Sequence, residues 1–242
     1  MIDIRLRQLD FCPGLREIYE SGRTVGRLGK VFDGLGALST VNNVITIRAL
    51  MFELKPNRTL EIGMAFGGST LTFSQSHKDL GRDPSKQHTA IDPAQSKYWD
   101  DAGRLLLENA GLEDYVEVIE TYSAQAMPRL VEEGRKFGMV YIDGSHQFED
   151  VLIDFIFTHE VLEVGGVILF DDSTDSHVAK VLRFLEANYD ETYAPVSLVR
   201  FRDGLGAKLK YRAASYLRKS QMRAYRKLRD GRQNWGKPLK AF

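Results

Sequence analysis

The sequence is poor in cysteine, in long apolar runs and in net charge. Its one cysteine, Cys12, excludes an intramolecular disulfide and is typical of a reducing compartment. Behind Met1 there is no apolar core of a signal peptide, and the apolar stretch at residues 165–170 has the length of a strand. No run approaches the length of a membrane span. We therefore expect a cytoplasmic protein.

A glycine-rich turn lies between a predicted strand and a predicted helix. The strand covers residues 59–62, after the turn signal Pro56-Asn57, and the helix begins near Ser69 or Thr70 as its N-cap. Three glycines separate the two elements, namely Gly63, Gly67 and Gly68. They permit positive φ and close approach of a ligand, while the helix N-terminus directs unpaired N–H groups at it. The pattern predicts a nucleotide-type binding turn.

Two ligand classes compete for this turn. A dinucleotide fingerprint has a glycine where Ala65 stands and an apolar residue where Glu61 stands. An acid before Gly63 suits a cationic group, such as the ammonium of S-adenosylmethionine. Here the chain resembles the class I S-adenosylmethionine-dependent methyltransferases, whose first motif reads Glu/Asp-x-Gly-x-Gly-x-Gly, with Ala65 as a departure from it. A tight turn without a ligand is the structural alternative.

After this turn, strands and helices alternate. We expect strands at residues 88–92, 116–120, 139–143 and 166–171, and helices at residues 98–110, 124–133, 149–163 and 177–189. The strands are short and nearly all apolar, as strands buried on both faces must be. The fold class is therefore α/β: a doubly wound, mostly parallel Rossmann-like sheet with helices on both faces. Residues 195–201 and 207–211, around Asp203-Gly204, predict a closing antiparallel hairpin.

The chain then divides into three predicted parts. Residues 1–55 form an N-terminal helical cover, with helices near 15–19 and 39–54. Residues 56–212 form the core, which the resemblance identifies as an S-adenosylmethionine-binding methyltransferase core. Residues 213–242 form a basic tail.

Ligands of open α/β sheets bind beyond the carboxyl ends of the strands. Asp92 is placed there to accept both ribose hydroxyls, or else it is a turn aspartate before Pro93. Ser123 and Ala124 match the place where the family holds adenine, and a simple N-cap at Ser123 is the alternative. The resemblance implies these cofactor-binding residues: Glu61, Gly63, Ala65, Gly67, Gly68, Ser69, Asp92, Ser123, Ala124 and Asp143.

Three carboxylates follow the next two strands, Asp143 after one and Asp171-Asp172 after the other. Neighbouring strands lie about 5 Å apart, so these acids converge, and a hard divalent cation such as magnesium would relieve their repulsion. The segment resembles the metal-dependent O-methyltransferases that act on small molecules and sugars. That resemblance implies a magnesium site at Asp143, Asp171 and Asp172. In the alternative, the acids cap helices and bind only solvent or the cofactor.

His146, three residues after Asp143, stands where a related branch has a lysine that deprotonates the acceptor hydroxyl. A histidine is suited to that task near neutral pH, and we predict His146 and Asp143 as catalytic residues. A histidine that only enters a helix and bonds to its loop is the alternative. His177 is a secondary candidate.

The C-terminal segment from Lys208 has twelve basic residues and one acid, Asp230, a net charge of +11. Apolar residues recur near helical spacing from Ala213 to Leu228, which predicts a basic amphipathic helix. It either packs on the body or a partner subunit, or contacts an anionic membrane surface, glycolipid or RNA.

We predict an S-adenosylmethionine-dependent O-methyltransferase that acts on a hydroxyl of a small molecule or sugar, assisted by Mg²⁺ at the three acids. A metal-independent methyltransferase of the same fold is the alternative enzyme. An RNA- or membrane-associated protein that retains the cofactor fold is the alternative from another class. We expect a cytoplasmic protein, either free or peripheral at a membrane surface, and a homo-oligomer is one assembly it could form.

Overall fold

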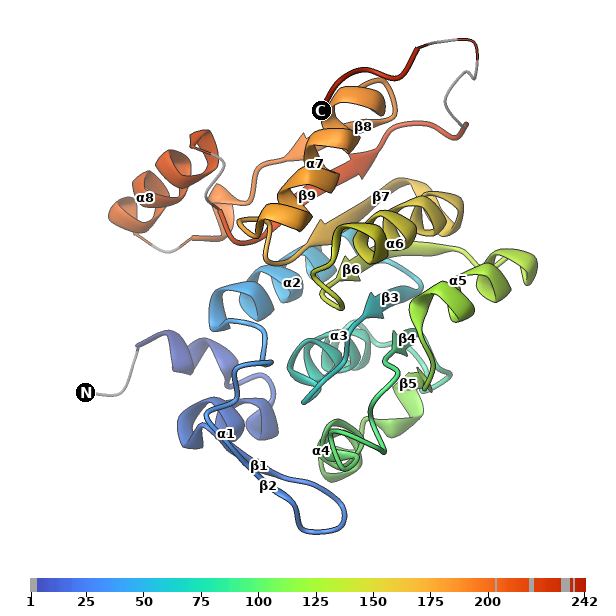
Figure 1. Ribbon diagram of the computed structural model, residues 1–242. Helices are drawn as coiled ribbons and strands as arrows, with labels where there is room; N and C mark the ends of the chain where they lie inside the picture. The colour runs from blue at the N-terminus through green and yellow to red at the C-terminus, as the bar shows by residue number, and fades with distance from the viewer. Residues whose placement is uncertain (1–3, 203, 218–219, 232–235, 237) are drawn as a thin grey trace. The chain divides into compact units, whose positions relative to one another are not determined.

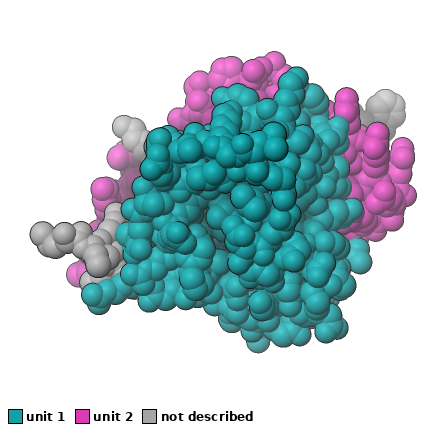
Figure 2. All heavy atoms as spheres, turned by 90° about the horizontal axis from the view of Figure 1, so that it is seen from below, with its two compact units in different colours: residues 1–123 teal, residues 124–242 magenta. Residues whose placement is uncertain are grey.

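The structure is a computed structural model that describes residues 4–202, 204–217, 220–231, 236 and 238–242. It separates into two compact units, residues 1–123 and residues 124–242 (Figure 2). Within the described residues, no helix is long and apolar enough to cross a membrane.

The first unit is an α/β unit with three parallel strands in the order β5-β4-β3. Its elements are η1 (Ile4–Leu9), α1 (Pro13–Ser21), β1 (Arg23–Val25), β2 (Val31–Asp33), α2 (Val41–Leu54), β3 (Thr59–Ile62), α3 (Gly68–Asp79), β4 (His88–Ile91), α4 (Ala102–Asn109), η2 (Glu113–Tyr115) and β5 (Val116–Ile119) (Figure 1). Every residue of β3 and β4 is buried, as expected of strands covered on both faces.

The two expected N-terminal helices are present as α1 and α2. Gly22, in the left-handed region at φ 63°, ends α1, and Thr40 caps α2 by accepting a hydrogen bond from the N–H of Asn43. The antiparallel strands β1 and β2, which lie between these helices in the chain, were not predicted from the sequence. Each has only three residues, too few to show an alternation of apolar and polar side chains. The N-terminal segment is therefore not wholly helical.

The second unit has four strands in the order β6-β7-β9-β8. Its elements are α5 (Ser123–Glu132), β6 (Phe137–Ile142), α6 (Phe148–Val161), β7 (Leu162–Phe170), α7 (Ser176–Asn188), β8 (Tyr193–Val196), η3 (Val199–Phe201), α8 (Leu205–Tyr216) and β9 (Arg223–Lys227). Strands β6 and β7 are parallel, whereas β9 is antiparallel to both β7 and β8. The predicted α/β class, with mostly parallel strands that end in antiparallel ones, is confirmed.

The antiparallel strands, however, are not the predicted ones. Residues 207–211 lie inside the helix α8, and the partner of β8 is β9, at residues 223–227. The prediction of a strand at 207–211 is therefore wrong. Ala207, Lys208, Leu209 and Lys210 are strong helix formers, and five residues are too few for the alternation to exclude a helix.

The predicted tail helix from Ala213 to Leu228 is also wrong. Helix α8 ends at Tyr216, and β9 is a strand that buries Ala224, Tyr225 and Lys227. The Lys227 ammonium donates to the carbonyl oxygens of His159 (2.7 Å) and Leu162 (2.8 Å), which makes this cation part of the interior. Part of the predicted tail belongs to the sheet. Of the predicted basic tail, residues 218–219, 232–235 and 237 lie outside the residues that the structure describes.

Candidate active site

The glycine turn between β3 and α3 has three residues in the left-handed region: Gly63 (φ 95°), Ala65 (φ 43°) and Gly67 (φ 81°). A non-glycine residue there costs on the order of 1 kcal/mol and is typical of binding sites. Helix α3 begins at Gly68 with Gly67 as its N-cap, two residues before the nearer expected N-cap, Ser69, and no side chain caps it. Its first-turn N–H groups are thus available to a ligand over the turn.

Packing accounts for two of the three glycines. A Cβ on Gly67 would lie 3.2 Å from Gly103 Cα of α4, and a Cβ on Gly68 would lie 2.6 Å from Leu38 Cδ1. These positions are small because protein atoms approach them, as the alternative of a tight turn requires. Gly63 and Ala65 also have positive φ, and the N–H of Ala65 donates to the Asp92 carboxylate.

Glu61, at the end of β3, is fully buried. Its Oε1 accepts a hydrogen bond from the Thr70 hydroxyl and lies 3.2 Å from His88 Nε2. Its Oε2 has no hydrogen-bond partner among the described residues. A buried carboxylate oxygen without a partner is costly, so this atom marks a place where a ligand or water completes the site.

Asp92 holds the turn in its shape. One carboxylate oxygen accepts from the N–H groups of Met64 (3.1 Å) and Ala65 (2.8 Å), and the other accepts from Ala94 N–H (2.8 Å). The side chain is almost fully buried. This combines both readings of Asp92: it is a turn aspartate, and it lies against the residues predicted to bind the cofactor. Its contact with ribose stays a prediction.

Two further polar residues near this turn were not predicted. Gln95 is buried, donates from Nε2 to Ala65 O (2.8 Å), and has no partner for its Oε1 among the described residues. Glu120, after β5, accepts from Ser96 and pairs with Arg104 (2.9 Å). Burial raises the pKa of Glu120, but these hydrogen bonds outweigh it and hold the pKa below its usual value. Gln95 comes shortly after Asp92 and Glu120 directly follows a strand, and these positions could have marked both residues as candidates for the site.

Ser123 and Ala124 stand at the start of α5. Ser123 is half-buried, and Ala124 is exposed. Their predicted role beside adenine stays a prediction.

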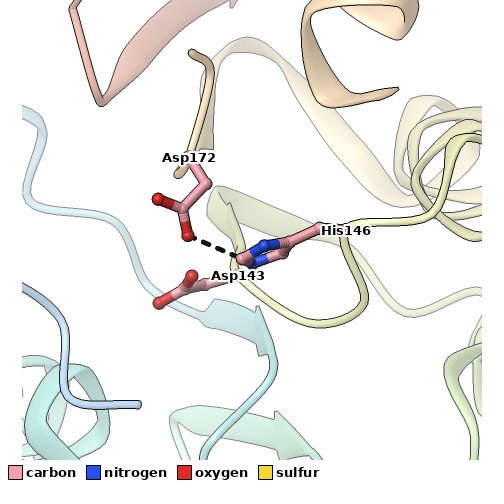
Figure 3. Close-up of side chains that lie close together, drawn as sticks. All are labelled: Asp143, His146 and Asp172. Carbon is pink, nitrogen blue, oxygen red and sulfur yellow. Dashed lines mark ion pairs between the residues drawn. The ribbon is translucent and has the colours of Figure 1, made fainter. Parts of the chain in front are cut away.

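In the second unit, Asp143, His146 and Asp172 lie together (Figure 3). One ligand atom from each lies within 4.8 Å of the others, and His146 Nε2 is 3.1 Å from Asp172 Oδ2. Asp143 follows β6, His146 lies in the β6–α6 loop, and Asp172 follows β7. The side chain of His146 is 46% exposed, so it is open to a substrate. A small hollow with room for about one water molecule is lined by Asp143, His146, Asp171 and neighbouring residues.

Asp171 lies next to this cluster, and its two oxygens are engaged by other groups. One oxygen accepts from the Tyr141 hydroxyl (2.5 Å) and the other from the N–H of Asp172 (2.8 Å). The Tyr141 hydroxyl also lies 3.0 Å from Asp143 Oδ2, so it links the two carboxylates. The predicted set of Asp143, Asp171 and Asp172 is therefore gathered only in part, and His146 takes the third place. Tyr141 was missed, although it lies two residues before Asp143 on the same face of β6.

The donor set suits either of two chemistries. Two carboxylates and an imidazole can ligate a divalent cation such as manganese or magnesium, although magnesium prefers oxygen alone. They can also form a carboxylate–imidazole pair that takes up a proton. His177 is not part of the set: its Nδ1 accepts from the N–H of Phe148 at the start of α6.

Comparison with known proteins identifies a methyltransferase domain in the chain. Residues 60–173 match the family Methyltransf_24, described as a methyltransferase domain. The caffeoyl-CoA O-methyltransferase of Stellaria longipes is 28% identical over 131 residues, 51% of this chain and 49% of that protein. The rhamnosyl O-methyltransferase of Mycobacterium leprae (strain TN) is 25% identical over 153 residues, 58% of each chain. The chain thus spans about half the length of the curated relatives it matches.

Solved structures show the same fold. The O-methyltransferase TomG from Streptomyces achromogenes, in complex with SAM, has a TM-score of 0.59 at 16% identity, over 94% of this chain and 91% of its own. A putative O-methyltransferase from Klebsiella pneumoniae has a TM-score of 0.62 at 16% identity, with the same coverage. Residues 60–173 thus match a methyltransferase domain, and the chain has the fold of these O-methyltransferases; both findings agree with the class I S-adenosylmethionine-dependent methyltransferase predicted from the sequence.

Proposed function

We propose that this methyltransferase methylates a hydroxyl of a small molecule or sugar. The observation that carries the proposal is the convergence of Asp143, His146 and Asp172, of which His146 is open to solvent. The glycine turn, Glu61 and Asp92 would hold S-adenosylmethionine. Bound there, the cofactor supplies an electrophilic methyl group.

A hydroxyl oxygen must lose its proton to become a good nucleophile. His146 is suited to accept that proton, because its Nε2 lies 3.1 Å from the Asp172 carboxylate. The negative charge of Asp172 orients the ring and stabilises the imidazolium that forms. Asp143, linked to Asp171 through the Tyr141 hydroxyl, would position the acceptor hydroxyl against the imidazole.

A divalent cation at Asp143, His146 and Asp172 is the alternative. It would lower the pKa of a hydroxyl bound to it. A His146 imidazole that ligates a cation through Nε2 cannot also take the proton at that atom. The two versions therefore predict opposite responses to chelation. Asp171 belongs to neither set directly and would act through Tyr141.

We also propose that residues 1–55 cover the cofactor turn. The Phe32 ring packs at 5.2 Å from that of Phe66 in the turn, and Phe66 packs at 4.8 Å from Trp99. Leu38 lies close to Gly68, and the Tyr19 hydroxyl holds the Ser39 carbonyl. These contacts would limit the access of water to the turn, which would strengthen charge interactions within it.

The acceptor class is proposed from the names of the relatives. They include a rhamnosyl and a caffeoyl-CoA O-methyltransferase, so sugar hydroxyls and phenolic hydroxyls are the two classes to test first.

The deciding experiment has two stages. Calorimetry with S-adenosylhomocysteine and with NAD tests the cofactor, and we expect only the former to bind. Transfer of a labelled methyl group is then measured on phenolic and rhamnose-containing acceptors, with His146→Gln compared against His177→Gln. We expect His146→Gln to lower kcat by about 100-fold or more and His177→Gln to have a small effect.

Three results would count against the proposal. Binding of NAD without binding of S-adenosylhomocysteine would exclude S-adenosylmethionine as the cofactor. Methylation of a nitrogen acceptor with no hydroxyl acceptor used would exclude O-methylation. Unchanged activity of His146→Gln in the presence and absence of a chelator would exclude the site.

A further inference from the structure

Helix α8 leaves the second unit as a separate arm (Figure 1). None of its residues, 205–216, is buried. The side chains of Leu205, Leu209 and Tyr216 are 75%, 55% and 90% exposed, and that of Leu217, the C-cap, is 60% exposed. Large apolar side chains with so much exposure on one short element call for a partner.

These side chains form a stripe. At 100° per residue, Leu205, Leu209, Ala213 and Tyr216 fall within about 80° of one another. The opposite side of the helix faces the protein, where the Tyr211 ring lies 4.9 Å from the Arg202 guanidinium. We call the outward set, with Leu217, the α8 stripe.

Basic residues flank the stripe. Lys208 and Arg212 lie on one side of it and Lys210 on the other, and residues 204–217 include no acid. A second copy of the chain seated on the stripe would bring two like-charged helices together, which is unfavourable. An anionic lipid surface satisfies both features, because it takes apolar side chains at its acyl boundary and basic ones at its headgroups.

We propose that α8 is an interfacial helix that docks the enzyme on an anionic lipid surface. The helix lies in the plane of the interface with the α8 stripe inserted and Lys208, Lys210 and Arg212 among the headgroups. A helix of about 18 Å is too short to span the apolar core. The site is distinct from the glycine turn and from Asp143, so the proposal does not depend on the acceptor.

The test uses the full chain and vesicles of phosphatidylcholine, with and without about a third of phosphatidylglycerol. We expect binding to the anionic vesicles alone and a steep loss with salt. Lys208→Gln, Lys210→Gln and Arg212→Gln together should weaken binding roughly 100-fold, at about fivefold a residue. Leu209→Ser with Tyr216→Ser should weaken it about tenfold or more.

Matched controls lie outside the helix. The charge control is Arg58→Gln, Lys78→Gln and Arg129→Gln together, and the apolar control is Leu28→Ser, whose side chain is 91% exposed. Both should bind as the parent does. Because none of the substituted residues is buried, all variants should keep the parent melting temperature.

Insertion is tested by attaching an environment-sensitive dye at Ala213→Cys or at Ala207→Cys. Both alanines are exposed, and they lie about 120° apart on the helix. The native Cys12 is buried and does not compete for the dye. Only the dye at position 213 should shift to shorter wavelength on anionic vesicles.

Several outcomes would overturn the proposal. These are absence of binding at low salt, equal loss in the controls, and equal spectral shifts at the two labelled positions. A parent dimer that the stripe variant dissociates would identify a second copy as the occupant. Binding of RNA, lost in the charge variant, without binding of vesicles would identify a nucleic acid.

Discussion

Asp92→Asn separates two roles that one carboxylate could have. In the structure its two oxygens accept three backbone N–H groups, from Met64, Ala65 and Ala94. An asparagine has one acceptor oxygen, so its amide N–H₂ must face at least one of these donors. With the side chain only 4% exposed, water cannot substitute for the lost acceptor.

The expected cost follows from that count. One hydrogen bond to a charged acceptor is lost and one buried N–H is left without a partner, which together cost about 2–3 kcal/mol. For a chain of this size, that lowers Tm by roughly 4–12 °C. Because the turn that Asp92 holds includes Ala65 at φ 43°, the affinity for S-adenosylhomocysteine should fall as well.

Urea unfolding and calorimetry measure the two effects on the same samples. Asp114→Asn is the control, since the Asp114 side chain is 74% exposed and should change stability by no more than about 0.5 kcal/mol. A fall in affinity with unchanged stability would mean that Asp92 serves the ligand and not the turn. If neither quantity changed, the reasoning from these three hydrogen bonds would be refuted.

Two further predictions concern buried cations and imidazoles. Lys227→Met removes the donor to the carbonyls of His159 and Leu162 and should lower the free energy of unfolding by about 2–5 kcal/mol. The control Lys78→Met, at an exposed position, should leave it unchanged. Equal urea midpoints for the two variants would contradict this prediction. Burial lowers the pKa of His77 to about 3, with help from His88 and Arg82. Below pH 6.5 the unfolded chain therefore binds more protons than the folded one. The free energy of unfolding then decreases as the pH is lowered, by up to about 1.4 kcal/mol per pH unit. His77→Gln should flatten that slope between pH 6.5 and 5 in urea titrations, unlike His177→Gln, and an unchanged slope would exclude His77 as its source.

The parallel strands were predictable because burial on both faces leaves an unambiguous apolar signature. β3, β4 and β6 are buried throughout and were found within two residues of their true bounds. The strand β9 was not predictable in this way. Its Arg223 and Tyr225 side chains meet Glu186, and Lys227 is capped by backbone carbonyls. Tertiary partners neutralise these polar groups, and a single sequence does not show them.

The site shows the same limit in finer detail. The predicted strand ends gave the positions of Asp143, Asp171 and Asp172 in the sheet. They did not give the direction in which each side chain points. Strand β7 ends at Phe170, and Asp172 has a left-handed backbone (φ 41°), a conformation that the sequence does not show. Asp171 is buried against Tyr141, while Asp172 meets His146. Alternation places Tyr141 and Asp143 on one side of β6, close enough for the 3.0 Å contact between them. Alternation along β6 could therefore have added Tyr141 behind the site, whereas the pairing of His146 with Asp172 depends on loop backbone that a single sequence does not show.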